Sequence, residues 1–142
     1  MPLLGGTALE VLAHAYGVPP PRPRSVNDLD FLCIEGYSRP VEAFDAYLAG
    51  LGLTRGRSAL ADPYIGYTGQ DARGKPIEVD LLRTYESHLA DAVLQMERLL
   101  VLTPAAQAAM KRQRLAQPLP GTSAERLALD RADIQWLSGL GR

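Results

Sequence analysis

The acids of Asp28-Leu29-Asp30 run directly into the apolar stretch Phe31 to Ile34, and this juxtaposition constrains the fold more than any other feature of the sequence. Side chains alternate between the faces of a strand, so Asp28 and Asp30 project from one face, about 7 Å apart at their Cα atoms. Leu29 and Phe31 then point into a core on the other face. The rest of the stretch is typical of a strand buried on both faces. The two acids therefore lie where a buried strand emerges.

A second acidic strand is predicted at Lys75 to Leu82. There, apolar residues alternate with Glu78 and Asp80, which gives one apolar face and one face carrying two carboxylates. Asp80 is favoured as the third acid of a site because it lies deeper between apolar neighbours, where a carboxylate is costly to desolvate unless a metal or another partner holds it. Glu78, nearer the polar turn, remains the alternative.

Gly5-Gly6-Thr7 forms a turn that opens a predicted helix from Thr7 through Tyr16, which Gly17 ends. Glycines permit close backbone approach, and free N–H groups at a helix N-terminus favour phosphate oxygens. Thr7 is expected to cap this helix and to contact a phosphate. Taken alone, Gly-Gly-Thr is more often an ordinary turn, and Asp-x-Asp is often a solvated strand end. Their order along the chain favours a phosphate and metal site.

The chemistry of this set of residues is that of phosphoryl and nucleotidyl transfer. Two Mg²⁺ ions roughly 3.5–4 Å apart need several hard oxygen ligands, and three carboxylates on neighbouring strands supply them. Asp28, Asp30 and Asp80 are therefore the predicted catalytic and metal-binding residues.

The same elements resemble the DNA polymerase beta-like nucleotidyltransferase superfamily. Its pattern is hydrophobic-Gly-Gly/Ser, a helix, Asp-x-Asp and a later hydrophobic-Asp-hydrophobic strand, here Leu4-Gly5-Gly6, Asp28-Leu29-Asp30 and Val79-Asp80-Leu81. More narrowly, Gly5 to Leu9 with Arg24 to Phe31 resembles the AbiEii-type nucleotidyltransferases, the enzymatic half of some bacterial toxin–antitoxin and phage-defence pairs. The resemblance covers roughly residues 3–35 and 75–82.

The resemblance implies transfer of a nucleoside monophosphate from a nucleoside triphosphate (NTP) such as ATP to a hydroxyl group on a tRNA or other RNA, a protein or a small molecule. Asp28 and Asp30 would ligate both Mg²⁺ ions, while Asp80 would ligate the second and accept the proton of the attacking hydroxyl. A cognate antitoxin or regulator protein is the implied partner.

Five residues are expected to hold the nucleotide. They are Gly5, Gly6 and Thr7 at the β- and γ-phosphates, with Arg24 and Lys111 as additional cations. Lys111 would neutralise the triphosphate from a C-terminal helix, although a helical lysine is more often simply solvated.

Two departures from the family pattern stand out. Only Met1 to Leu4 precede the glycine turn, where the family usually carries a helical lead-in, so the first strand is expected to be short and poorly anchored. A trimmed or mis-started chain is one explanation. The segment Pro19 to Arg24 is inserted before the acids and is expected to form a loop at the mouth of a cleft.

Two other functional classes are consistent with these features. The first is a non-catalytic protein of nucleotidyltransferase fold that binds a toxin–antitoxin partner. Three clustered carboxylates argue against it, because such groups repel one another and gain nothing without a cation. The second is an aminoglycoside-type resistance enzyme, which an acceptor screen would separate from the toxin hypothesis.

The predicted fold class is α+β, a small mixed sheet with helices packed on it and further helices at the C-terminus. Residues 1–102 would form the catalytic core and 103–142 a helical extension packed on it as one compact unit, in keeping with 142 residues of which 46% are apolar. The single cysteine, Cys33, excludes an internal disulfide and fits a reducing cytoplasm. No apolar run is long enough to span a bilayer, so no membrane association is expected.

The remaining elements follow from local signals. Helices are predicted at Arg39 to Leu51, at Pro104 to about Arg114 behind the Thr103 cap, and after the capping box Thr122 to Glu125. Residues 63–69 should form the strand that pairs with the second acidic strand through a turn. Residues 92–102 fit either a short hairpin or one helix.

Overall fold

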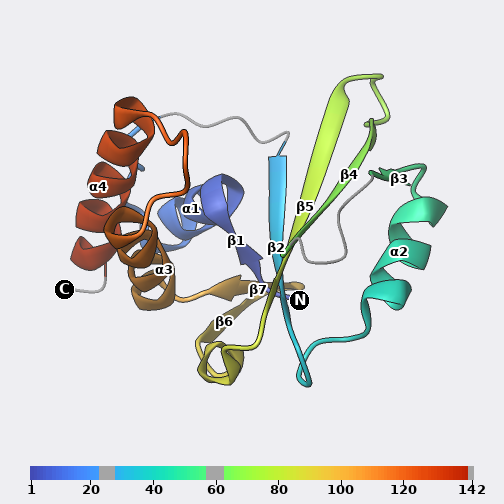
Figure 1. Cartoon of the computed structure of the whole chain (residues 1–142), viewed down its shortest axis with the longest axis horizontal. Helices are drawn as coiled ribbons and strands as arrows, with labels where there is room; N and C mark the ends of the chain where they lie inside the picture. The colour runs from blue at the N-terminus through green and yellow to red at the C-terminus, as the bar shows by residue number, and fades with distance from the viewer. Residues whose placement is uncertain (23–27, 57–62, 141–142) are drawn as a thin grey trace.

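The computed structural model describes residues 1–22, 28–56 and 63–140, which form a mixed sheet with helices on both faces (Figure 1). This confirms the predicted α+β class. The strands are β1 (Leu3–Leu4), β2 (Asp28–Ile34), β3 (Thr54–Arg55), β4 (Tyr64–Gln70), β5 (Pro76–Thr84), β6 (Val93–Met96) and β7 (Leu99–Leu102). The helices are α1 (Gly5–Tyr16), α2 (Val41–Gly50), α3 (Pro104–Ala116) and α4 (Ala124–Gly139), with a short 3-10 helix η1 (Ser87–Ala90).

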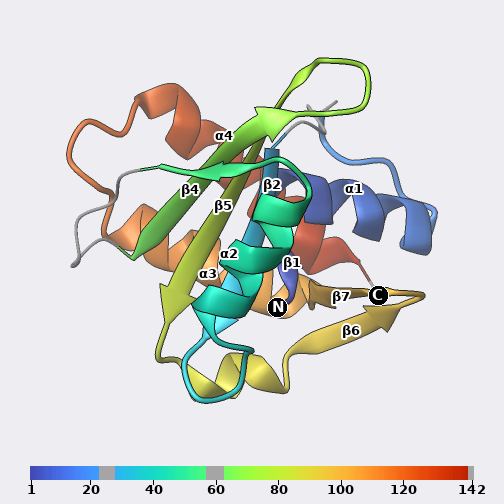
Figure 2. The same cartoon turned by 90° about the vertical axis from the view of Figure 1, so that its right-hand side faces the viewer.

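The sheet has the strand order β3-β4-β5-β2-β1-β7-β6, with the acid-bearing strands β2 and β5 side by side and parallel. Alternation along these strands separates two cores. Cys33, Val79 and Leu81 pack beneath α2, which covers one face of the sheet in Figure 2. Leu32 and Ile34 face the other side and pack with residues of β7 and α3. The acids share this second face, so they lie on the side of the sheet that α3 covers.

A third core ties the C-terminal helices to the sheet. It joins α1, β1 and β7 to α3 and α4 through fully or almost fully buried side chains, namely Leu3, Ala8, Leu9, Leu12, Val101, Ala108 and Leu137. Figure 1 shows α1, α3 and α4 grouped on one side of the sheet, with α2 on the other. The helices that follow β7 are therefore held in a fixed position above the acidic strands.

Strand β1 is short, as predicted, but the expectation that it is poorly anchored is wrong. Leu3 pairs with Phe31 of β2 in antiparallel fashion and with Val101 of β7 in parallel fashion. It is 3% exposed. Two residues are held firmly here because backbone partners lie on both sides and the side chain of Leu3 is buried in the core.

Local signals located most of the other elements. Residues 92–102 form the antiparallel hairpin β6–β7 rather than a helix. The hydroxyl of Thr103 accepts the N–H of Ala106 at 3.2 Å, so the predicted start of α3 is confirmed. The start of α4 is confirmed to within one residue: Ser123, not Thr122, is the cap, and its hydroxyl accepts the N–H of Arg126 at 3.1 Å. Strand β3 was not predicted, because two residues carry no periodic signal.

Truncation of Leu9 to alanine tests whether the third core holds the fold. Leu9 is completely buried on α1. We expect Leu9→Ala to lower the free energy of unfolding by about 2–5 kcal/mol in urea denaturation. Leu51→Ala, at a side chain that is 57% exposed, is the matched control and should change stability by less than about 0.5 kcal/mol. Equal effects at the two positions would contradict this packing.

Candidate functional site

Two pairs of acids face one another across the junction of β2 and β5. The parallel register places Asp28 opposite Glu78 and Asp30 opposite Asp80. Alternation along both strands puts all four on the same face of the sheet. Both sequence candidates for the third acid are therefore at the site, and neither is deeply buried, since Glu78 and Asp80 are both open to the cleft.

The glycine turn packs directly against one of these acids. Gly5 has φ +72°, and a Cβ atom at this position would lie 2.0 Å from Oδ2 of Asp30. Only glycine fits, both for the backbone conformation and for the close approach. The N-terminus of α1 thus begins beside the carboxylates.

Thr7 has a different role from the predicted one. Helix α1 starts at Gly5, and its N-cap residue Leu4 makes no side-chain capping bond, so the prediction that Thr7 caps the helix is wrong. The Thr7 hydroxyl instead donates a 2.6 Å hydrogen bond to the carbonyl oxygen of Asp28. This bond ties the first turn of the helix to the start of the acidic strand.

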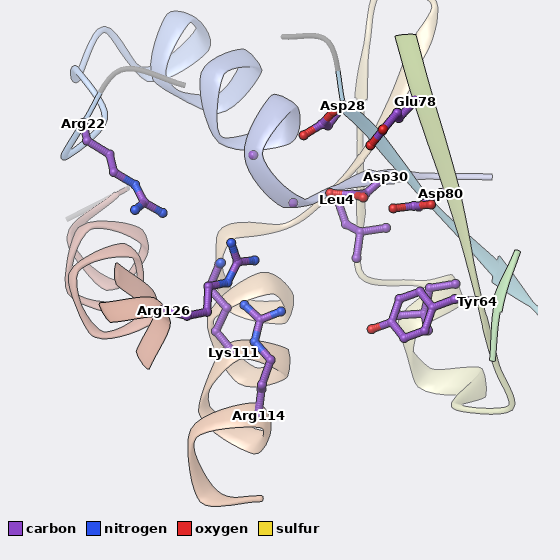
Figure 3. Close-up of a pocket in the computed structure, with 13 residues that line it drawn as sticks. Leu4, Arg22, Asp28, Asp30, Tyr64, Glu78, Asp80, Lys111, Arg114 and Arg126 are labelled. Carbon is purple, nitrogen blue, oxygen red and sulfur yellow. The ribbon is translucent and has the colours of Figure 1, made fainter. Parts of the chain in front are cut away.

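A cleft of about 580 Å³ lies between these acids and the C-terminal helices. Figure 3 shows the two walls: Asp28, Asp30, Glu78 and Asp80 project from the strands on one side, and the side chains of Lys111, Arg114 and Arg126 extend toward them from the helices. Arg22 also lines the cleft. The volume falls within the range of about 300–1,000 Å³ typical of small-molecule sites.

The basic wall is fixed by buried carboxylates on α4. Asp130 is fully buried, and its carboxylate accepts hydrogen bonds from Lys111 Nζ at 3.2 Å and from Arg114 Nε at 2.7 Å. Asp133, also fully buried, lies 3.0 Å from Lys111 Nζ and 3.7 Å from Arg22. Lys111 is thus 8% exposed and held in place, not solvated.

The charges of this cluster reinforce one another. Burial by itself would raise the pKa of Asp130, but the hydrogen bond from Arg114 and the nearby charges of Arg114 and Lys111 lower it below its usual range. The hydrogen bond to Asp130 in turn raises the pKa of Arg114. Arg126 differs, since no carboxylate among the residues that the structure describes lies within ion-pair distance of its guanidinium. Its charge is available to a ligand.

The acidic wall carries uncompensated charge. Partial burial raises the pKa of the Asp30 carboxyl, and the neighbouring Asp80 and Asp28 raise it further, while Arg126 and Lys111 only partly offset this. The pKa of Asp80 is also raised, first by partial burial and then by Asp28, even though its side chain opens to the cleft. Such mutual repulsion is relieved when a cation binds between the carboxylates.

These carboxylates have the right chemistry for Mg²⁺, which prefers hard oxygen ligands. Within residues 1–22, 28–56 and 63–140, no three acids are already clustered closely enough to hold a metal ion. The paired acids project from adjacent strands at matching positions of the register. Asp28, Asp30 and Asp80 fit a metal by donor type and by unbalanced charge.

Most of the predicted residues meet at this cleft. Those that line it are Gly5, Gly6, Asp28, Asp30, Asp80 and Lys111. Thr7 acts through the backbone of Asp28, and Arg24 falls outside the described residues. Sequence reasoning missed Tyr64, Arg114 and Arg126 as lining residues, whereas Arg22 belongs to the segment that was expected at the mouth of a cleft. A signal for two of them exists, because Arg114 lies three residues after Lys111 and Arg126 four before Asp130, spacings that share a helix face.

No protein-family model matches the chain, and no curated protein matches it. Among solved structures, the crystal structure of the complex between the Type VI effector Tas1 and its immunity protein aligns with a TM-score of 0.33 and 16% identity, over 97% of this chain and 78% of that chain. A similarity this low does not establish a common fold. Among the described helices, none is long and apolar enough to cross a membrane.

Replacement of Gly5 by alanine tests the contact with Asp30. Gly17 serves as the control because it also has a positive φ, +66°, but a Cβ atom there meets nothing within 4 Å. We expect Gly17→Ala to cost about 1 kcal/mol of unfolding free energy from backbone strain alone. Gly5→Ala should cost clearly more, since Asp30 must also move. Equal losses in urea denaturation would show that the contact is unimportant.

The raised pKa of Asp30 predicts that this carboxyl lowers the free energy of unfolding in a pH-dependent way. The unfolded chain releases the Asp30 proton near the usual value of 3.8, whereas the folded protein holds it to a higher pH. The Asp30 carboxyl therefore does not destabilise the fold below pH 3.8, and its destabilising contribution grows as the pH rises from 3.8 through the folded pKa. In chelator, Asp30→Asn should be more stable than wild type at pH 7, and the difference should vanish toward pH 3.8. A wild type more stable than the variant at pH 7 would contradict this.

Proposed function

We propose that this protein is a metal-dependent nucleotidyltransferase, which transfers a nucleoside monophosphate from an NTP to a hydroxyl acceptor. One observation supports this most: an acidic wall and a basic wall face each other across a single cleft. Four carboxylates with unbalanced charge lie on one side, and Lys111, Arg114 and Arg126 lie on the other. A triphosphate with bound cations complements both walls, since its cations match the carboxylates and its phosphates match the basic side chains.

The protein's own residues have distinct roles in this proposal. The N–H groups at the start of α1, at Gly5 and Gly6, bind the terminal phosphates, and Lys111 and Arg114 neutralise their charge. Arg126, which has no ion-pair partner among the described residues, approaches the triphosphate from α4. Most of the rate enhancement then comes from positioning and charge stabilisation, without a covalent enzyme intermediate.

Asp28, Asp30 and Asp80 would hold the metal ions. Bound Mg²⁺ supplies charge neutralisation for the triphosphate and lowers the pKa of an attacking hydroxyl. The hydroxyl oxygen attacks the α-phosphorus and its proton passes to the carboxylate of Asp80, while the bond to the β-phosphate breaks and pyrophosphate leaves beside Lys111 and Arg114.

Within this class, the motifs favour an AbiEii-type enzyme of a toxin–antitoxin pair. The supporting residues are the glycine turn and the Asp-x-Asp strand, which the fold brings into direct contact at Gly5 and Asp30. The acceptor in this proposal is a tRNA, a protein or a small molecule. An acceptor screen with radiolabelled NTP separates these three.

Calorimetric titration tests the proposal without knowledge of the acceptor. A non-hydrolysable NTP analogue with Mg²⁺ should bind the wild type and should bind the double variant Asp28→Asn/Asp30→Asn at least about 100-fold more weakly, since metal ligands matter more than the outer residues that support them. Asp71→Asn/Asp91→Asn removes the same number of carboxylates away from the cleft and should leave binding unchanged.

Either of two results would overturn this assignment. One is a folded wild type that binds no analogue with Mg²⁺, which would favour the non-catalytic interaction protein. The other is equal weakening of analogue binding in the two double variants, which would show that the loss of binding reflects the change in net charge and not the loss of metal ligands.

A further inference from the structure

A second hollow of about 360 Å³ opens beside the charged cleft and continues it. The two share lining residues, among them Tyr64, Leu82, Lys111 and Arg114. The character of the lining changes from one to the other. The acids and Arg126 line only the first, whereas Met110 and Leu119 line only the second. A ligand that spans both would be anionic at one end and apolar at the other.

Tyr64 stands at the junction of the two hollows. Its side chain is 44% exposed, a large aromatic surface open to the cleft. In Figure 3 the ring of Tyr64 lies below Asp80, on the sheet side of the cleft. Its hydroxyl end is directed toward the helix that carries Arg114. An aromatic ring in this position offers a face for another planar ring.

One helix face supplies the opposite wall. Gln107, Met110 and Arg114 follow one another at intervals of three or four residues along α3, so they share one side of that helix, and Gln117, the residue after its end, also lines the hollow. The flexible thioether of Met110 and the amides of Gln107 and Gln117 are thus among the groups that line this hollow. An amide can form hydrogen bonds with the edge of a heterocycle, and a methionine side chain can pack against its face.

Gln107 carries the most specific signal. It is 3% exposed, and its Nε2 donates a 3.0 Å hydrogen bond to the carbonyl oxygen of Leu102. That bond fixes the amide, so the other end of the group is the acceptor Oε1. This oxygen is buried and has no hydrogen-bond partner among the described residues. An unsatisfied buried acceptor is costly, and a donor supplied by a ligand removes the cost.

We infer that this second hollow is the nucleobase subsite of the nucleotide. The inference rests on the proposed function, since Lys111 and Arg114, which belong to both hollows, place the triphosphate next to it. The base stacks on Tyr64, with Met110 on its other side. An N–H group of the base donates to Oε1 of Gln107 after the atoms that cover this oxygen in the empty hollow move aside, while the phosphates remain between the charged walls.

Comparison of two anions separates the subsite from the triphosphate site. Mg²⁺ with inorganic tripolyphosphate probes the charged cleft alone, and Mg²⁺ with the α,β-methylene analogues of ATP, GTP, CTP and UTP probes both hollows. By calorimetry, we expect the tightest analogue to bind wild type about 5- to 100-fold more tightly than tripolyphosphate, the range that stacking on an aromatic side chain supplies.

Tyr64→Leu removes the stacking ring but keeps an apolar side chain. It should abolish this advantage of the analogue and leave tripolyphosphate binding unchanged. Tyr85→Leu is the matched control, because Tyr85 is 81% exposed and lies away from both hollows. Gln107→Met, with its fold checked by thermal melting, should weaken the analogue about 2- to 10-fold, again without affecting tripolyphosphate.

The outcomes distinguish the two proposals. If tripolyphosphate and the analogues bind equally, or if Tyr64→Leu and Tyr85→Leu behave alike, the nucleobase subsite is wrong and the charged cleft stands. If neither anion binds the folded wild type with Mg²⁺, the proposed function fails and the subsite fails with it.

Discussion

The in-register parallel pairing of β2 with β5 is the constraint on which the rest of this molecule depends. It sets Asp28 beside Glu78 and Asp30 beside Asp80, although like charges placed directly opposite one another destabilise a sheet. The apolar residues that alternate with these acids leave no other choice. A slip by one residue would turn Val79 and Leu81 out of the core beneath α2 and turn the acids into it. The fold therefore gathers the acids as a by-product of burying the opposite face.

The opposite wall is organised differently, because its cations other than Arg126 are paired with buried carboxylates. Asp130 and Asp133 are both fully buried on α4, and they hold Lys111, Arg114 and Arg22 in fixed positions. A buried ion pair adds little net stability, since desolvation consumes most of the attraction, but breaking one is expensive. Its benefit here is geometric. Cations that would otherwise move freely in solvent are kept aimed across the cleft.

Sequence reasoning succeeded where local pattern decides the outcome. Alternation located β2 and β5 and the shared face of their acids, and capping chemistry located the starts of α3 and α4. It failed where tertiary contacts decide. Thr7 looks like a helix cap, but the helix begins two residues earlier and its hydroxyl bonds to Asp28. Lys111 looks solvated because its buried partners lie 19 and 22 residues further along the chain. Arg114 and Arg126, which lie beside Lys111 in the basic wall, were missed for the same reason.

Strand β1 has a mechanical consequence for the cleft. In the part of the chain that the structure describes, Leu3 and Leu4 are the residues that join β2 to β7 within the sheet. The acids belong to the strands on one side of this junction, and β7 leads into α3 and α4 on the other. These two residues therefore set the lateral spacing between the strand that carries Asp28 and Asp30 and the strand that leads into the basic helices.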